Sequence, residues 1–218
     1  MRKHKVWRLP VIVGAVIFIL SGVAVATPTT DLSQTINPGT LVTSILDDDR
    51  ESVANPSVAM TAQNFSFDCQ TSEGIFGSNT ERVYVVNPSA ATNGWTLTLA
   101  ATDGVSAEWE NGDSSSTFAF NDPDGTPDGC DNGQLTVDPS DSTLTADCET
   151  CSTDNISKGS SAGFASGTVD SVTLLNASDS SDDVWRGYLT DVDLSQTIPG
   201  ETPADTYSIN LTLTATAQ

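Results

Sequence analysis

Histidine and basic residues are scarce in this sequence. The only histidine, His4, and four of the 8 Lys and Arg residues lie within residues 1–26. The rest of the chain has 29 Asp and Glu residues against four basic ones, a net charge of −25, and the basic residues are Arg50, Arg82, Lys158 and Arg186. Nucleic-acid binding needs clustered Lys and Arg, and an anionic membrane surface repels an acidic protein. We therefore expect neither nucleic acid nor a membrane as a partner of residues 27–218.

The lack of histidine after residue 26 also excludes an ordinary Ser-His-Asp triad and an imidazole base. Paired carboxylates could still cleave a glycosidic bond. Nothing in the order of the 29 acids singles out one pair, however. We predict that the protein is not an enzyme, and we rank a glycan hydrolase that uses two acids last among the functions considered.

Long apolar runs are absent except at the N-terminus. Residues 1–8 are basic, residues 9–20 are apolar, and small residues follow up to Ala24-Val25-Ala26. This order is typical of a secretory signal peptide with an Ala-x-Ala cleavage site. Because the apolar run is shorter than the ~20 residues of a spanning helix, an uncleaved anchor is the less favoured alternative. We expect a signal peptide over residues 1–26, one domain over residues 27–218, and a location outside the cell, at the cell surface or cell wall.

The remaining apolar residues alternate with polar ones. Trp95, Leu97 and Leu99 alternate with threonines, and the stretch from Tyr207 to Ala217 repeats the pattern. A period of two places the apolar side chains on one face of a strand. The sequence therefore predicts an all-β fold, a single antiparallel β-sandwich or jelly-roll-like domain.

Turn-rich breaks separate further predicted strands. They cover residues 41–46, 58–68, 82–86, 106–110, 117–120, 134–137, 143–146, 171–175 and 185–193. No segment has a convincing helical period. We interpret residues 152–167 as a loop that Phe164 holds in place.

One hexapeptide occurs twice. Asp31-Leu32-Ser33-Gln34-Thr35-Ile36 returns unchanged at residues 193–198, and Pro and Gly follow both copies. The favoured interpretation is an edge strand used twice, with Pro38 and Pro199 ending each copy. The alternative is a pair of equivalent strands in a pseudo-symmetric sandwich.

Four cysteines follow the predicted signal peptide: Cys69, Cys130, Cys148 and Cys151. An even number in an oxidising compartment predicts two disulfides, with three possible connectivities. Residues 134–137 and 143–146 resemble a hairpin, so Cys130, before its first strand, lies near the base of the hairpin opposite Cys148 and Cys151. We therefore expect Cys130 to pair with Cys148 or Cys151, and Cys69 with the remaining one. A zinc site at Cys148-x-x-Cys151 lacks two further soft ligands.

The densest acidic stretch, residues 121–133, is a candidate calcium site. Its carboxylates alternate with turn residues and could supply several hard oxygens. The register does not fit an EF-hand, but residues 122–131 resemble one loop of a thrombospondin type 3 repeat. The candidate ligands are Asp122, Asp124, Asp128 and Asp131. A plain acidic turn is the equally favoured alternative.

Aromatic residues are few, and some of them could stack on a sugar. The alternation around Trp95 predicts a core role for that residue. Trp109 lies between Glu108 and Glu110, and Trp185 precedes Arg186, so these two are the better candidates for a partly exposed surface. The predicted ligand-binding residues are Trp109, Trp185 and Tyr188.

Two stretches resemble the WxL domains of bacterial surface proteins. Asn93-Gly94-Trp95-Thr96-Leu97-Thr98 is similar to the first Trp-x-Leu motif of that family, and the last strand keeps Tyr207, Leu211 and Thr212 of its C-terminal motif. Leu213 and Ala215 replace the second Trp and its following Leu. The resemblance implies a secreted β-rich domain that binds the cell wall noncovalently through peptidoglycan.

These observations predict a secreted, non-catalytic cell-surface protein that associates with cell-wall glycan through a WxL-like domain. The alternative is a structural subunit that self-associates into a fibre or layer by strand addition, with the residues before Leu41 as the donated strand.

Overall fold

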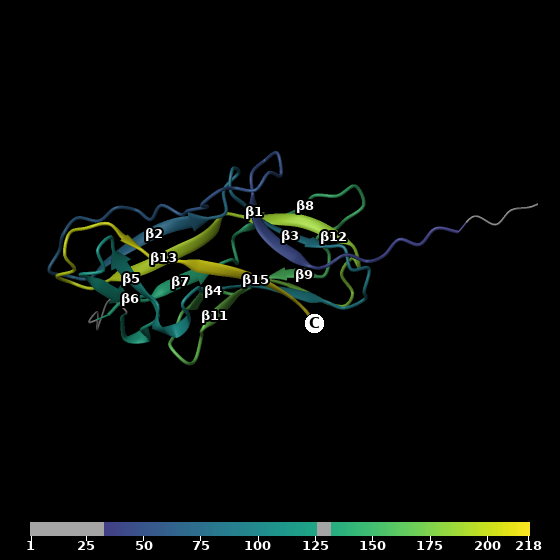
Figure 1. Ribbon diagram of the computed structural model, residues 1–218. Coiled ribbons are helices and arrows are strands. Elements are labelled where there is room, and N and C mark those ends of the chain that lie inside the picture. Colours follow the sequence, from purple (N-terminus) through teal and green to yellow (C-terminus); the bar gives the residue numbers. More distant parts are fainter. Residues whose placement is uncertain (1–32, 126–131) are drawn as a thin grey trace, which may run out of the picture. The chain divides into compact units, whose positions relative to one another are not determined.

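The alternating segments form β-strands, and the protein is all-β, as predicted (Figure 1). The computed structural model describes residues 33–125 and 132–218. Asn37–Gln218 forms one unit, and of the residues before it only 33–36 are described. The predicted signal peptide lies outside the described residues. Within those residues there is no α-helix, and hence no helix that could cross a membrane.

The strands form four sheets, and every ladder between described strands is antiparallel. The first sheet has the order β1 (Val42–Leu46), β3 (Arg82–Asn87), β12 (Trp185–Thr190), β8 (Thr143–Ala146). The second is β10 (Ala162–Gly163), β7 (Leu135–Asp138), β13 (Val192–Ile198), β2 (Gln70–Phe76). The third is β15 (Leu211–Ala217), β4 (Trp95–Ala101), β11 (Ser171–Ala177), β9 (Ile156–Lys158). The fourth is β14 (Tyr207–Ser208), β5 (Glu108–Asn111), β6 (Thr117–Ala119).

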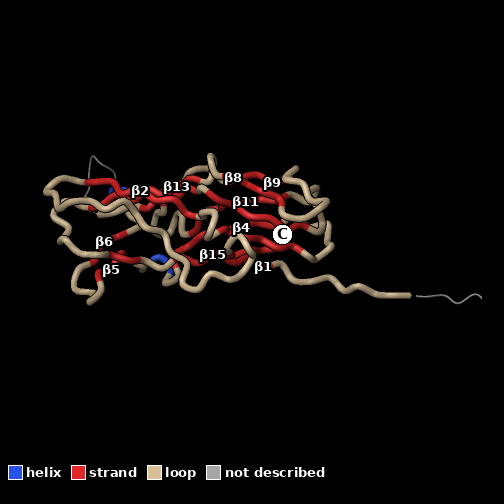
Figure 2. Tube along the Cα trace, turned by 90° about the horizontal axis from the view of Figure 1, so that it is seen from above, coloured by secondary structure: helices blue, strands red, loops and turns tan. Residues whose placement is uncertain are grey.

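Two stretches of chain pass from one sheet to another. β12 continues into β13 through Asp191, whose φ of 63° lies in the left-handed region, and so links the first sheet to the second. β14 continues into β15 and links the fourth sheet to the third. The domain is therefore a β-sandwich with two ends, in which the first sheet faces the third and the second faces the fourth (Figures 1 and 2).

The end built from the first and third sheets is closed around two tryptophans. Trp95 of β4 and Trp185 of β12 are 0% and 1% exposed, and their ring centroids lie 5.3 Å apart. Leu97 and Leu99 follow Trp95 on the same buried face of β4, as the alternation predicted. We call this part of the domain the tryptophan end.

Several strand predictions need correction. Residues 58–68 form no strand, and the missed strand β2 follows at Gln70–Phe76. The predicted strand over residues 185–193 is two strands that belong to different sheets. The predicted loop at residues 152–167 contains the short strands β9 and β10. Within that loop the anchoring role of Phe164 is confirmed, because its buried ring packs 5.1 Å from that of Phe120.

The two hexapeptide copies have different structures. Residues 193–198 lie in β13, which pairs with β2 on one side and β7 on the other. Residues 33–36, the described part of the first copy, form no strand and are exposed. The edge-strand interpretation is therefore wrong for the second copy, because a strand with two ladders is central.

Candidate ligand-binding cavity

A cavity of about 320 Å³ opens at the end of the domain where the second and fourth sheets face each other. We call this part of the domain the cavity end. Strands β2, β5, β6, β13 and β14 supply the inner wall, and the loops at residues 62–66 and 199–206 supply the rim. A volume of this size suits a sugar of one or two rings, since ligand pockets begin at about 300 Å³.

Aromatic rings form much of the inner wall. Trp109 of β5 and Phe118 of β6 stack at 6.0 Å with an interplanar angle of 13°. Phe118 in turn meets Tyr207 of β14 edge to face at 5.1 Å. All three rings are half-buried and line the cavity. Aromatic faces carry partial negative charge, so they attract the C–H groups on the flat side of a sugar ring.

A buried amide holds Trp109 in place. The indole Nε1–H of Trp109 donates to Gln196 Oε1 at 2.8 Å, and Gln196 is 2% exposed. The amide nitrogen of Gln196 donates to the carbonyl oxygen of Thr197 at 2.7 Å, so its orientation is determined. Because both ends of the amide are used, the indole is positioned before any ligand arrives.

The rim of the cavity carries polar groups. Asn111 donates from Nδ2 to Asp205 Oδ2 at 2.9 Å, and this bond lowers the pKa of Asp205. The Tyr207 hydroxyl donates to the carbonyl oxygen of Pro203 at 3.0 Å. Gln63, Asn64 and Gln70 also line the cavity. Amides, a hydroxyl and a carboxylate around aromatic rings match the alternating polar and apolar faces of a carbohydrate.

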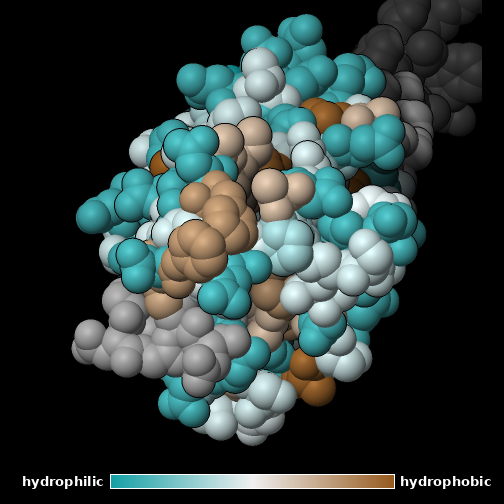
Figure 3. Space-filling model, turned by 90° about the vertical axis from the view of Figure 1, so that its left-hand side faces the viewer, coloured by the Kyte–Doolittle hydropathy of each residue, from teal (hydrophilic) through white to brown (hydrophobic). Residues whose placement is uncertain are grey.

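Exposed phenylalanines lie close to this cavity. Phe65 and Phe67 are 52% and 76% exposed, and their rings meet edge to face at 5.2 Å. Phe65 lines the cavity rim. Figure 3 views this end of the domain and shows apolar side chains gathered within a largely polar face.

The structure separates the three predicted ligand-binding residues. Trp109 lines the cavity, whereas Trp185 is 1% exposed and donates from Nε1 to the carbonyl oxygen of Ser152 at 2.8 Å. The expected partial exposure of Trp185 is wrong, because Trp95 and the chain at Ser152 cover both its ring and its N–H group. Tyr188 is half-buried, 5.2 Å from Tyr84, with the Arg82 guanidinium 4.7 Å from its ring centre.

Sequence reasoning did not select Phe118, Tyr207 or Gln196 as site residues. A signal was present for Gln196, which takes the inward-facing place between Leu194 and Ile198 in an alternating strand. A polar side chain in such a place needs a hydrogen-bond partner. The alternation does not say which one, since Trp109 is 87 residues away.

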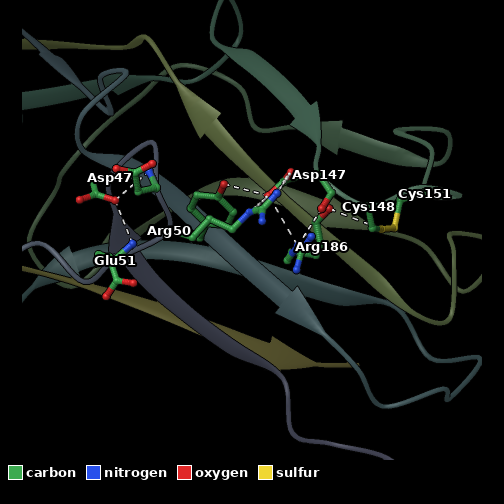
Figure 4. Close-up of polar contacts among 9 residues, drawn as sticks. Asp47, Arg50, Glu51, Asp147, Cys148, Cys151 and Arg186 are labelled. Carbon is green, nitrogen blue, oxygen red and sulfur yellow. Dashed lines mark hydrogen bonds and ion pairs between the residues drawn. A yellow bond between two sulfur atoms is a disulfide. The ribbon is translucent and has the colours of Figure 1, made fainter.

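A second polar cluster lies on the first sheet around Asp147 (Figure 4). Arg50 donates to both carboxylate oxygens of Asp147, from Nε at 2.7 Å and from Nη2 at 2.8 Å. Tyr84 donates its hydroxyl to the same carboxylate at 2.9 Å, and Arg186 donates from Nε to the carbonyl oxygen of Asp147 at 2.7 Å. The cluster joins the turn after β1 to the ends of β8 and β12.

The charges in this cluster satisfy one another. The hydrogen bonds that Arg50 donates to Asp147 hold the pKa of Asp147 below its ordinary value, and the same bonds raise the pKa of Arg50. Burial, with Asp147 beside it, raises the pKa of the Tyr84 hydroxyl. Lys158, which lies outside this cluster, donates to the carbonyl oxygen of Ser142 at 2.7 Å. This cluster therefore has a structural role.

The predicted calcium site is only partly described. Asp128 and Asp131 lie outside the described residues. Asp122 accepts hydrogen bonds from the backbone N–H of Asp124 at 2.9 Å and from Asn132 Nδ2 at 2.7 Å. No cluster of three metal-ligating side chains occurs among residues 33–125 and 132–218. Calcium binding at Asp122, Asp124, Asp128 and Asp131 stays a prediction.

Cys148 and Cys151 form a disulfide with each other, with their Cα atoms 5.3 Å apart. The prediction that one of them pairs with Cys130 and the other with Cys69 is wrong. The chain turns directly after β8, which brings two cysteines three residues apart within bonding range. Cys69 is also disulfide-bonded, and Cys130 lies outside the described residues.

The two stretches that resemble a WxL domain are neighbours in the third sheet. β15 pairs with β4, and Leu213, which replaces the second Trp, lies opposite Leu99. Comparison with protein-family models finds no match for the chain, and comparison with curated proteins finds none either. The resemblance therefore depends on these two strands alone.

Proposed function

We propose that the protein is a secreted, non-catalytic protein of the cell surface that binds cell-wall glycan in the aromatic cavity. The observation that carries the proposal is Trp109, which is half-exposed, stacked on Phe118 and held by the buried amide of Gln196. A rigid aromatic wall with a polar rim favours sugar rings, and the basic N-terminus with its apolar run favours secretion.

The ligand class follows from the chemistry of the cavity. Among the described residues that line it, Asp205 is the one carboxylate and none is basic, so a neutral or amide-bearing sugar suits the cavity better than an anionic one. Peptidoglycan carries N-acetylated sugars, whose amide and hydroxyl groups match Gln63, Asn64 and Gln70. The resemblance to WxL domains favours the same ligand.

The test is sedimentation of the secreted chain with purified cell walls, with and without chelator. We expect the unaltered protein to sediment with walls and the Trp109→Ala variant to remain in solution. Phe67→Ala is the matched control, because Phe67 is exposed near the cavity and is not among the residues that line it. Equal sedimentation of Trp109→Ala and unaltered protein, or none by either, would contradict the proposal.

A second candidate function is that of a self-assembling structural subunit. The specific observation is that residues 33–40 are exposed and form no strand, although four of them belong to a hexapeptide that forms a central strand elsewhere in the chain. A segment of this kind could add to a sheet of another molecule.

A further inference from the structure

A groove of about 600 Å³ runs between two edge strands of the sandwich, β1 of the first sheet and β15 of the third. Its lining includes three residues of the main core, Leu99, Leu135 and Leu194, which are 1%, 1% and 5% exposed. The groove therefore reaches the interior of the domain.

The edge strands do not close over this core. Leu211 and Leu213 of β15 and Ile45 of β1 face the groove and are only half-buried, whereas every second residue of the central strand β4 is fully buried. Among the described residues, β15 has a ladder only with β4, and the outer side of β1 bonds only near its end, where Val53 donates to the carbonyl oxygen of Ile45. Among the described residues, the groove side of β15 therefore has no ladder partner.

The chain contains a segment with the right sequence for this place. The hexapeptide at residues 193–198 forms ladders on both sides and buries Leu194 and Gln196. Its other copy ends in residues 33–36, which make no ladder, and Ile36 is 88% exposed. Identical sequences share strand propensity and alternation, so Gln34 and Ile36, the counterparts of Gln196 and Ile198, can also face a core.

The distribution of charge also favours contact between this segment and the groove. The chain carries 29 acidic residues, yet residues 32–46 contain no charged residue. Among the described residues that line the groove, Glu81 alone is charged. An uncharged segment and a groove with a single carboxylate can meet with little of the repulsion that opposes other contacts between copies of so acidic a protein.

The backbone at Gly39 indicates which molecule supplies the segment. The N–H of Gly39 donates to the carbonyl oxygen of Pro88 at 3.0 Å, which extends the β1–β3 ladder beyond Val42 and Val86. Gly39 is thus held beside β3. Residues 33–36 could reach the groove of their own molecule only through a tight turn over the two residues before Gly39, a constraint that a second copy does not impose.

We propose that residues 33–40 of one copy insert as a strand into the groove between β1 and β15 of a second copy. This inference rests on the second candidate function and names its donor and acceptor. The contact is heterologous, because the segment of each copy binds the groove of another and leaves its own groove free. Such contacts produce open chains of subunits. Added salt favours the assembly, because it screens the repulsion between acidic copies.

The experiment compares three variants of the secreted chain by sedimentation velocity over a range of protein concentrations. Ile36→Asp alters the segment, Leu213→Asp alters the groove, and Val184→Asp is the control at an apolar side chain that is 56% exposed and lines neither. We expect Ile36→Asp and Leu213→Asp to raise the concentration needed for assembly by more than about tenfold, since each buries an unpaired charge. Val184→Asp should assemble as the unaltered protein does.

Mixing the two defective variants gives a sharper result. The intact segment of Leu213→Asp should enter the intact groove of Ile36→Asp, and the mixture should stop at a one-to-one dimer. A labelled peptide with the sequence of residues 31–41 should also bind the Ile36→Asp protein, whereas a scrambled peptide should not. The peptide result tests the groove even if Leu213→Asp fails to fold.

The outcomes separate the inference from both proposed functions. If Ile36→Asp assembles as the unaltered protein does, strand insertion by residues 33–40 is wrong, but the second candidate function, a self-assembling structural subunit, still stands. A protein that stays monomeric and ignores the peptide would overturn both. The Ile36 amide could also be protected from hydrogen exchange to the same extent at every protein concentration. That result would show insertion within one molecule and would overturn the proposed insertion between copies. Trp109 and Tyr207 line both the groove and the cavity, so wall binding is compared at protein concentrations below that of assembly, where Ile36→Asp and the unaltered protein should bind alike.

Discussion

Trp185 and Trp109 both lie on central strands, β12 and β5, but their surroundings differ at the two ends of the sandwich. At the tryptophan end, Trp185 packs on Trp95 and gives its N–H to a backbone carbonyl, so both its ring and its polar atom are buried. At the cavity end, Trp109 gives its N–H to a buried glutamine while its ring lines a cavity. In both cases the N–H group is satisfied inside the protein. The difference lies in what covers the ring.

This difference has a physical origin in the sheets. The first and third sheets have four strands each, whereas the fourth has three short strands, two of them of two and three residues. A small sheet covers less of the sheet that faces it. The loops at residues 62–66 and 199–206 complete the cavity end, and loops leave space where strands would pack side chains tightly. The cavity end is therefore suited to binding, and the tryptophan end to stability.

The largest expected effect comes from removing one ring at each end. Trp185→Ala should lower the free energy of unfolding by about 3–5 kcal/mol, because it leaves a cavity in the core. Trp109→Ala should lower it by roughly 1–2 kcal/mol, since that ring already borders open space and its loss leaves Gln196 without one partner. Urea unfolding of both variants measures the difference. Equal losses would remove the distinction between the two ends.

The next effect concerns the bond between Trp109 and Gln196. Gln196→Leu keeps the volume of the side chain but leaves the indole N–H unpaired, so we expect a loss of about 1–3 kcal/mol in the free energy of unfolding. A double-mutant cycle with Trp109→Phe should give a coupling of about 1 kcal/mol, because the second change removes the orphaned donor. Strictly additive losses would mean that the two residues do not act as a pair.

The Asp147 cluster at the first sheet predicts a pH effect. The pKa of Asp147 is lowered in the folded protein by Arg50, so its contribution to stability is present above the unfolded value of about 4 and is lost as the pH falls below it. Asp147→Asn should cost about 1 kcal/mol at pH 7, a value reduced for partial exposure. The difference in free energy of unfolding between the unaltered protein and Asp147→Asn should shrink below about pH 4.

Urea unfolding between pH 7 and pH 2.5 provides the measurement. Asp48→Asn is the control, because Asp48 is exposed on the same turn after β1 and makes no hydrogen bond to Arg50. Relief of repulsion among acidic residues at low pH affects all three proteins alike and cancels in the comparison. A cost of Asp147→Asn that is the same at every pH would contradict an electrostatic role.

The smallest expected effect is that of calcium. If Asp122, Asp124, Asp128 and Asp131 bind calcium with the millimolar affinity common in extracellular modules, a calcium concentration equal to the dissociation constant stabilises the fold by about 0.4 kcal/mol. Chelation should then lower Tm by about 1–2 °C. Differential scanning calorimetry with and without chelator measures this shift. An unchanged melting curve would leave the stretch as a plain acidic turn.

Local pattern was sufficient to predict much of the fold. The strand over residues 143–146 has the predicted bounds, and those at residues 41–46 and 82–86 differ by one residue. The missed strand β2 carries Glu73 and Gly74 and has a weak alternation, because its outer side meets a loop at Thr61 and Met60. The candidate site was harder to predict. Trp109 was selected for its polar neighbours, but the same argument selected Trp185, which is in the core.

The sequence by itself determined that this chain folds as antiparallel β-sheet, since alternation along a strand is a local property that each segment carries wherever it packs. The tertiary structure decided which tryptophan is covered, which cysteines meet and which copy of the hexapeptide becomes a central strand. Those outcomes depend on partners that lie tens of residues away, such as Gln196 for Trp109 and Arg50 for Asp147. In β13 all six residues of the hexapeptide pair with β2 and the first four also pair with β7. Residues 33–36 of the other copy make no ladder, because pairing requires neighbouring strands as well as a suitable sequence.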